Sequence, residues 1–541
     1  MAKQKGLLGV QKSQMFFSIG GEDWPSEDDS DSDYEKAAAS VSKNGHGLAS
    51  DSKKKKQPKN STKRKRKEKA AVGSGNQGLS KTKKRRIQDK DDRNSGTGAS
   101  TSKQAEAETN SEKSIQVLPS EIVVHILKYV VEDGGAIPTL CRLARLCRSW
   151  REACTHPSLW KTVDLSYGWA TNKVDTLRWL SANRFTQVQV VNLSSWTRLA
   201  NSTVQVLAEN CPTLETVSLF RCVKLTSEAV KALVDKCPQL SSLDLSYTMN
   251  DMVSPSTLKY IAEKCGGRLK HLTISGNTVV GFLQSLKHLM DNCPNLRGLD
   301  FSGCKFTTDS IRFNIEDCQD AWPHLQILRM ACCKIYASDV SAVRKATSPG
   351  FPELQEFSAA AEPHEINGLF VSGAGITNDF LQRVLKTSYD LKVLDIRNCA
   401  RIEPASLLPQ DIPPTRLEHL YISQCSITKT DYVGHTNYFG QMMKKWRHSL
   451  RDLDLAWNTY PSVDDLEKAM KKLSAHPDQS ELKTLDLRGT AIEVGAVKSL
   501  LTGCPQLEQL NLASCRGLPR GIKRLHEGKS LLQLRKDIKK M

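Results

Sequence analysis

The chain has 541 residues, enough for more than one structural unit, and carries a formal net charge of +18. The positive charge is concentrated in residues 53–86. This stretch holds 16 Lys and Arg against one acid, Glu68, and has a net charge of +15. A polyanion or an import receptor is therefore a candidate partner for this stretch and not for the whole chain.

Neither a run of about 18 apolar residues nor the apolar core of a signal peptide is found, so we expect a soluble intracellular protein. Its 16 cysteines should stay reduced in such a compartment. The sequence contains no Cys-x-x-Cys pair of the kind that structural zinc sites use, and no phosphate-binding loop. We therefore predict no metal, no cofactor and no catalytic residue.

Residues 1–112 are rich in Ser, Gly, Lys and Asp and lack aliphatic periodicity, which predicts a disordered tail. Its acidic block, residues 20–35, places Ser26, Ser30 and Ser32 among carboxylates. An acid-directed kinase would deepen the charge of this block by phosphorylating those serines.

Basic clusters follow the acidic block. They predict a nuclear import signal, which places the protein in the nucleus, with the cytoplasm as a second compartment. The alternative is a solvated charged linker, and residues 53–86 are also a candidate for a weak nucleic-acid contact. The residues assigned to import are Lys53, Lys54, Lys55, Lys56, Lys63, Arg64, Lys65, Arg66, Lys67, Lys83, Lys84, Arg85 and Arg86.

Two helical segments come next. Residues 118–130, "LPSEIVVHILKYV", predict an amphipathic helix, and residues 138–154 predict a second one after a Gly-Gly loop. Pro157 ends this unit, and Leu159-Trp160 closes it. About 45 residues are too few to bury so many large side chains. Trp150 and Trp160 therefore either anchor a partner or pack on the repeats that follow.

An internal repeat occupies the rest of the chain. Its frame has an apolar residue at position 0 and again at positions +3 and +5, as in Val188, Val191 and Leu193, which is typical of a short strand. Most frames are 25 to 29 residues apart, and three spacings are longer, at 32, 33 and 37. The twelve frames start at Val188, Leu214, Leu240, Leu269, Leu296, Leu325, Leu354, Leu391, Leu417, Leu450, Leu482 and Leu507.

A helical stripe precedes each of several frames, as in Val204, Leu207, Ala208 and Cys211, after which a proline ends the helix. A second Cys or Asn position lies at +8, where a small side chain can sit inside the turn after the strand. Most of the cysteines fall at the end of a helical stripe or at +8, and we therefore expect them to be structural. The +8 residues are Cys222, Asn277, Cys304, Cys333, Cys399, Cys425, Asn458 and Cys515.

One strand and one helix per repeat is the signature of leucine-rich repeats, and Cys at +8 resembles their cysteine-containing subclass. The fold class is therefore α/β, a solenoid with parallel strands on the concave side and helices on the convex side. Twelve strands at roughly 4.7–4.9 Å give an inner arc of about 55 Å, which suits a protein ligand.

The segment before the repeats resembles the F-box. It has Leu-Pro-x-Glu, a helix, Cys-Arg-x-Trp and Pro-Ser-Leu-Trp, although the loop at residues 131–139 is longer than the usual turn. The resemblance divides the chain into a tail (1–112), an all-α F-box (113–161), the repeats (162–526) and a basic C-terminal tail (527–541). The residues it implies for contact with a Skp adaptor are Leu118, Pro119, Ile122, Ile126, Leu127, Cys147, Trp150, Leu159 and Trp160.

By this resemblance the chain is a non-catalytic substrate receptor of a Skp–cullin–F-box ubiquitin ligase. The F-box would dock the Skp adaptor, which connects to a cullin–RING scaffold, and the solenoid would hold a protein substrate for ubiquitination. The rival hypothesis is a nuclear, RNA-associated scaffold that uses the basic arm for nucleic acid and the repeats for proteins. The two hypotheses are not exclusive.

Strand positions +2, +4 and +6 should point into the concavity, because strand residues alternate between faces. There, seven acids and the three bases Arg329, Arg397 and Arg488 leave the face near −4, which predicts a substrate with a basic segment. The alternative is that Asp after the +3 leucine is simply frequent in such repeats. The acids are Asp244, Asp300, Glu356, Asp395, Asp452, Asp454 and Asp486.

Overall fold

The computed structural model describes residues 118–166, 174–249, 251–308, 310–361, 363–366, 369–372, 375–408, 416–425, 437–459, 461–538 and 540. All belong to one compact unit, Glu108–Met541. The acidic block and the basic clusters lie outside the described residues, so the assignments made there stay predictions.

The first elements are short helices: α3 (Ser120–Gly134), α4 (Thr139–Leu143), α5 (Arg148–Ala153) and the 3-10 turn η1 (Pro157–Trp160). The single helix predicted for residues 138–154 is wrong, because the chain leaves helical geometry before α5. Cys147 is extended, with φ −157° and ψ 175°. The Arg151 side chain donates from Nε to the Ala144 carbonyl oxygen at 3.2 Å, so a backbone carbonyl at this break in the helix still has a hydrogen-bond donor.

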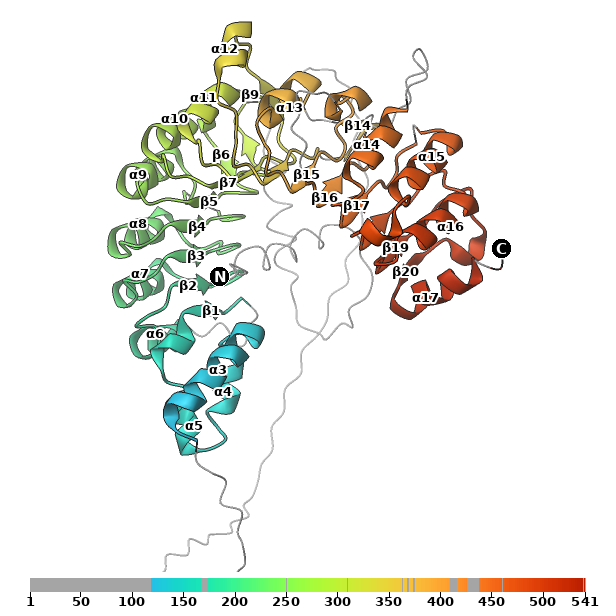
Figure 1. Cartoon of the computed structure of the whole chain (residues 1–541). Coiled ribbons are helices and arrows are strands. Elements are labelled where there is room, and N and C mark those ends of the chain that lie inside the picture. The colour runs from blue at the N-terminus through green and yellow to red at the C-terminus, as the bar shows by residue number, and fades with distance from the viewer. Residues whose placement is uncertain are drawn as a thin grey trace, which may run out of the picture. The chain divides into compact units, whose positions relative to one another are not determined.

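A curved sheet follows, whose strands run side by side along the inner face of an arc (Figure 1). All twelve predicted frames form strands, each three residues long, and β1 precedes them. Neighbours pair in parallel, with the buried residues in register, as in Val191 with Val217 and Val217 with Leu243. The strands are β1 (Thr162–Asp164), β2 (Val190–Asn192), β3 (Thr216–Ser218), β4 (Ser242–Asp244), β5 (His271–Thr273), β7 (Gly298–Asp300), β10 (Ile327–Arg329), β12 (Glu356–Ser358), β15 (Val393–Asp395), β16 (His419–Tyr421), β17 (Asp452–Asp454), β18 (Thr484–Asp486) and β19 (Gln509–Asn511).

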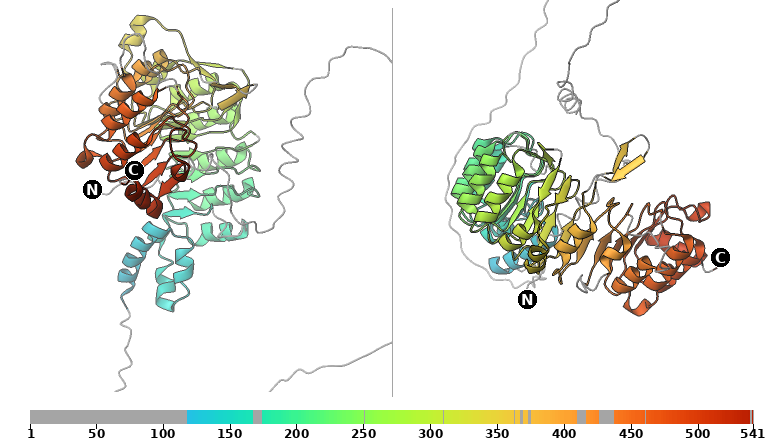
Figure 2. Two further views of the ribbon diagram at one scale, coloured as in Figure 1. Left: turned by 90° about the vertical axis from the view of Figure 1, so that its right-hand side faces the viewer. Right: turned by 90° about the horizontal axis from the view of Figure 1, so that it is seen from above.

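The convex side carries the helices, which are stacked beside one another in Figure 2. The predicted stripe is confirmed in α7, where Val204, Leu207 and Ala208 are buried and Cys211 forms the buried C-cap. These elements are α6 (Val174–Asn183), α7 (Asn201–Asn210), α8 (Ser227–Lys236), α9 (Pro255–Cys265), α10 (Phe282–Asn292), α11 (Ile315–Ala321), α12 (Ala342–Thr347), α13 (Asn378–Leu385), η2 (Pro404–Leu407), α14 (Tyr438–Trp446), α15 (Val463–Leu473), η4 (Pro477–Gln479) and α16 (Val494–Gly503).

The C-terminal end is closed by η5 (Arg520–Ile522), β20 (Leu525–Glu527) and α17 (Gly528–Asp537). β20 pairs antiparallel with β19, so the last parallel strand has no open edge. His526, opposite Leu510, is buried. The segment predicted as the end of the repeats and a basic tail therefore forms a cap, as the terminal units of solenoids usually require.

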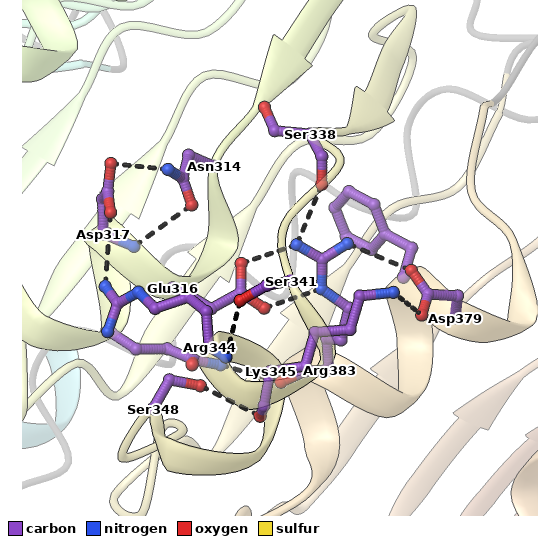
Figure 3. A network of polar contacts seen from close by, with 12 residues as sticks. Asn314, Glu316, Asp317, Ser338, Ser341, Arg344, Lys345, Ser348, Asp379 and Arg383 are labelled. Atoms are coloured by element: carbon purple, nitrogen blue, oxygen red, sulfur yellow. Dashed lines mark hydrogen bonds and ion pairs between the residues drawn. The ribbon is translucent and has the colours of Figure 1, made fainter.

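The middle repeats depart from the regular pattern. Short parallel pairs form here in the connections between a strand of the main sheet and the next helix: β6 (Thr278–Val279) with β8 (Lys305–Phe306), and β9 (Ile311–Phe313) with β11 (Ile335–Ala337). The hairpin of β13 (Pro363–Ile366) and β14 (Leu369–Ser372) occupies the longest spacing. An ion-pair network holds α11, α12 and α13 together here (Figure 3).

A ladder of hydrogen bonds joins successive repeats at position +8. The side chain at +8 donates to the carbonyl oxygen at +5 of the preceding repeat. Examples are Cys222 Sγ to Leu193 (3.2 Å), Cys304 Sγ to Ile274 (3.2 Å) and Asn277 Nδ2 to Leu245 (2.9 Å). Position +7 has a left-handed backbone in most frames, at a non-glycine residue such as Tyr247 or at a glycine such as Gly276. The predicted structural role of the +8 cysteines is confirmed by these bonds.

Candidate functional site

An apolar stripe runs along the solvent side of α3. Val123 and Leu127 are buried and hold the helix to the rest of its segment, since α3 packs on α4, α5 and η1. On the other face Ile122 is 47% exposed and Ile126 is 37% exposed, one helical turn apart. Exposed aliphatic side chains in a row are typical of a surface that a partner covers.

The predicted adaptor residues fall into two groups. Leu118, Pro119, Ile122, Ile126 and Cys147 are exposed, and Trp150 is partly buried against the core. These six remain available to a partner.

Leu127, Leu159 and Trp160 lie in the interior instead, so the structure reassigns them from adaptor contact to packing. Trp160 is 4% exposed. Its Nε1 donates to the Cys154 carbonyl oxygen at 2.9 Å, and its ring lies 6.2 Å from that of Phe185, between centroids. Trp160, Val163 and Leu165 also occupy positions 0, +3 and +5 of a thirteenth frame, which ends in β1. The last residue of the helical segment is thus also the first core residue of the repeats.

Three further exposed apolar residues of this segment were not among the predicted ones. They are Tyr129 (64% exposed), Val130 (38%) and Leu146 (65%). The helical period contained the signal for two of them, since Tyr129 lies seven residues after Ile122 and Val130 lies four after Ile126. Leu146 gave no such signal, because it lies in the break between α4 and α5.

Comparison with known proteins bears on this segment directly. A family model described as F-box-like matches residues 115–166. The chain is also 25% identical over 293 residues to F-box/LRR-repeat protein 4 from Bos taurus, an alignment that covers 45% of this chain. The chain therefore contains an F-box-like segment and is similar to an F-box/LRR-repeat protein. It spans 42% of the length of that relative, less than half.

Solved structures with similar folds are more distant. A chain in the structure of the yeast Rad7 and Elc1 complex is 16% identical, with a TM-score of 0.43 over 74% of this chain and 90% of that chain. An internalin from Listeria monocytogenes is 14% identical, with a TM-score of 0.34 over 63% and 95%. Neither similarity supports an argument about function. Residues 178–187 and 514–524 resemble the family member numbered six, and this finer assignment stays a prediction.

The concave face of the repeats is the second candidate surface. Four of its seven predicted acids are engaged by arginines on the same strands or their neighbours. Arg329 contacts Glu356 (Nη2–Oε2, 2.8 Å) and Asp300 (Nη1–Oδ2, 3.5 Å). Arg397 contacts Asp395 (2.8 Å), and Arg488 contacts Asp486 (2.9 Å). Because Glu356 and Asp395 are only 4% and 2% exposed, the structure reassigns these two from substrate contact to internal ion pairs.

The remaining acids are half-buried. Asp244 accepts from Ser218 Oγ at 2.8 Å, and Asp452 Oδ2 lies 2.5 Å from His419 Nδ1. Burial raises the pKa of Asp454 to about 6, with a further contribution from Asp486, although the Ala456 backbone N–H and Arg397 act in the opposite direction. The ion pairs leave the count of −4 unchanged, since the three arginines are already included in it, but they place Glu356 and Asp395 out of reach of a substrate.

The described residues contain no group of three or more His, Cys, Asp or Glu side chains that could hold a metal ion. None of the helices described is both long and apolar enough to cross a membrane.

Proposed function

We propose that this chain is the substrate receptor of a Skp–cullin–F-box type ubiquitin ligase. The observation that carries the proposal is the exposed apolar stripe of Ile122, Ile126, Tyr129 and Val130 on an F-box-like domain. A Skp adaptor would cover this stripe and connect the chain to a cullin–RING scaffold. The resemblance to an F-box/LRR-repeat protein supports the same assignment.

The chemistry in this proposal belongs to other subunits. The repeats would hold a protein substrate, and a ubiquitin-loaded enzyme on the scaffold would transfer ubiquitin to a substrate lysine. The chain contributes proximity, because tethering raises the effective concentration of that lysine near the thioester. A nuclear location is part of the proposal and rests on the basic clusters between residues 53 and 86.

The test is a pull-down of a purified Skp adaptor with Ile122→Glu/Ile126→Glu. Two carboxylates placed on the stripe should abolish binding, because each would have to lose water at an apolar interface. Both side chains are exposed, so the thermal unfolding midpoint should stay at the wild-type value. The matched control is Leu532→Glu, since Leu532 is a 61% exposed leucine on α17. Wild-type recovery of the adaptor by the double variant would refute the proposal.

A further inference from the structure

The concave face of β15, β16, β17 and β18, which lie side by side in the sheet (Figure 1), repeats one charged pattern. On β15 and β18 an aspartate at position +4 is followed at +6 by an arginine that turns back onto it. Arg397 contacts Asp395 at 2.8 Å, and Arg488 contacts Asp486 at 2.9 Å. β17 has the aspartate of this pattern, Asp454, but no arginine at +6. One carboxylate of this face therefore has no cation from its own strand.

Asp454 has polar neighbours but no charged partner. It accepts from the Ala456 backbone N–H at 2.9 Å, and a hydrogen bond with the Ser423 side chain opposes the larger effect of burial on its pKa. It takes part in none of the ion pairs found in the part of the chain that the structure describes. Ser423 and Ala456 occupy position +6 of β16 and β17 with small side chains, and Asp454 stays half-buried. A cation from a bound ligand can reach the carboxylate.

The neighbouring strand shows how this face holds a guanidinium. Tyr421, at +4 of β16, lies between Asp395 and Asp454 in the register of the sheet. The Arg397 guanidinium lies 5.5 Å from the centroid of the Tyr421 ring while it contacts Asp395. A planar cation that stacks on a ring and pairs with a carboxylate is characteristic of arginine and not of lysine.

Trp457 provides a second ring beside Asp454. It follows Asp454 by three residues, at +7 of the same strand, and is 46% exposed. Its φ of 57° lies in the region where glycine is the least strained residue, so a large side chain here has a cost. The ring lies over Gly489 of the next repeat, where a Cβ would overlap it. Tryptophan exposed in this way is a common anchor of protein interfaces.

The other half of the sheet has the same arrangement with an arginine already in place. On β4, Asp244 at +4 and Tyr247 at +7 occupy the positions of the aspartate and tryptophan of β17. The Arg221 guanidinium, from +7 of β3, lies 5.8 Å from the centroid of the Tyr247 ring. The residue at +7 of β16 is the uncharged Gln424. Among the described residues, no cation lies over the Trp457 ring.

We propose that an arginine side chain of a bound protein enters the concave face at Asp454, where its guanidinium pairs with the carboxylate and stacks on Trp457. The inference rests on the proposed function in calling that protein the substrate. Charge favours the same ligand, because positions +2, +4 and +6 of β15 to β18 hold four acids and two arginines, a net charge of −2.

The energetic cost of Asp454 agrees with a role in binding. Burial raises its pKa to about 6, so the ionised carboxylate destabilises the folded chain at neutral pH. A residue that lowers stability is expected where it serves a function, since stability and binding often oppose each other at such sites. A bound guanidinium supplies the charge that the strand itself lacks.

The first test measures the fluorescence anisotropy of a labelled peptide, Gly-Arg-Gly-Arg-Gly, with the full chain at physiological salt. Asp454→Asn should weaken binding at least about fivefold, because the guanidinium loses its charged acceptor. The matched control Asp244→Asn removes the same charge from the same position of β4 and should change binding less than about twofold. Citrulline in place of arginine keeps the shape without the charge and should weaken binding at least about tenfold, and lysine at least about threefold.

The second test addresses the ring. Trp457→Ala should weaken binding of the arginine peptide severalfold, because the stacking partner is lost. Tyr247→Ala is the matched control, since Tyr247 is 47% exposed at the same position with a φ of 52°, and its ring already carries Arg221. This control should change peptide binding less than about twofold. Thermal unfolding midpoints show that each variant is folded.

The third test uses pH. Binding requires ionised Asp454 while arginine stays charged, so affinity for the peptide should fall by about tenfold from pH 7.5 to pH 5, through the pKa of about 6. Asp454→Asn should lose this step and retain only the pH dependence of the groups that face Asp454. Those groups are Asp395 and Arg397 on β15, His419 and Tyr421 on β16, Asp452 on β17, and Asp486 and Arg488 on β18.

Several results would overturn the proposal. They are no binding of the arginine peptide by the wild-type chain, equal binding of the arginine and lysine peptides, and equal losses from Asp454→Asn and Asp244→Asn. An adaptor pull-down on the same samples separates this inference from the proposed function. Retained adaptor binding without peptide binding refutes the arginine site alone, whereas peptide binding without adaptor binding supports the site and refutes the ligase assignment.

Discussion

Arg383 and Glu316 form a two-pronged ion pair between α13 and α11, although 67 positions separate them in the sequence (Figure 3). Arg383 Nε and Nη2 donate to the two Glu316 carboxylate oxygens at 2.7 and 2.6 Å, and both side chains are almost fully buried. Burial alone would raise the pKa of Glu316, but the bonds from Arg383 outweigh it and the pKa is lowered. The pair connects two helices of the irregular middle repeats.

Glu316→Gln or Arg383→Met should therefore destabilise the chain by about 3–5 kcal/mol, because one buried charge loses its partner. Urea unfolding measures the loss. Arg344→Met is the control in the same network, since Arg344 contacts Asp317 and Asp320 near the surface and should contribute less than about 1 kcal/mol. Equal losses from the buried and the exposed arginine would contradict this account.

Asp454 gives a dependence of stability on pH. Its folded pKa of about 6 lies above the ordinary value of 3.8, so the folded state binds more protons between these values and stability falls as pH rises through this window. Asp454→Asn should remove the effect and stabilise the chain at pH 7.5 by about 2 kcal/mol, with little gain at pH 4. Thermal unfolding at both pH values tests this. A gain of the same size at pH 4 would show that the charge is not the cause.

The two tryptophans of the F-box should respond differently to truncation. Trp160→Ala removes a buried ring at the junction with the repeats and should cost about 3–5 kcal/mol of stability. Trp150 is only partly buried, so Trp150→Ala should cost less stability and more adaptor binding. Thermal unfolding and adaptor pull-down, run on both variants, separate the two roles. The assignment fails if Trp160→Ala leaves the unfolding midpoint unchanged.

The +8 ladder predicts which cysteine substitutions are tolerated. Burial raises the pKa of Cys304 to about 12, so the thiol keeps the proton that it donates to Ile274. Cys304→Ser keeps a donor and should stay within about 1 kcal/mol of the wild type. Cys304→Ala removes one of the two side-chain donors to the Ile274 carbonyl oxygen, which still accepts from Asn277 Nδ2 at 2.8 Å, and should lose about 1 kcal/mol more than Cys304→Ser. The urea midpoint of Cys304→Ser should be higher than that of Cys304→Ala. A lower midpoint for Cys304→Ser would exclude a role for the bond.

Position +7 allows backbone strain to be tested. Tyr247→Gly places the residue suited to a φ of 52° at this site and should keep stability within about 1 kcal/mol of the wild type, as urea unfolding would measure. Gly276→Ala should destabilise the repeat, because its Cβ would overlap the Tyr247 ring at a positive φ. Combining the two changes should recover part of that loss. A double variant no more stable than Gly276→Ala alone would show that overlap with the Tyr247 ring is not the cause of the loss.

Local periodicity was enough to predict the sheet. Each of the twelve frames became a strand, because apolar residues at +3 and +5 can share one buried face only in an extended chain. The first strand was missed for a related reason. Trp160 had been assigned to the F-box motif, although Val163 and Leu165 completed a frame that starts at it. Most of the exposed stripe on α3 was likewise accessible from helical spacing.

Contacts between distant positions were not accessible in this way. Nothing local to Arg383 indicates Glu316 as its partner, and a count of acids along the strands could not show that Glu356 and Asp395 are buried in ion pairs.

Because Trp160 belongs to both the F-box-like segment and the first frame, the direction from the proposed adaptor surface to the solenoid is set at that residue. Adding or removing a repeat then changes the distance from Trp160 to a given point on the solenoid by about 4.8 Å, together with one small rotation. A chain that lacks one internal repeat would present the same ligand closer to the scaffold by that step. The choice of lysine modified on a substrate would then follow the number of repeats between Trp160 and the point where the substrate is held.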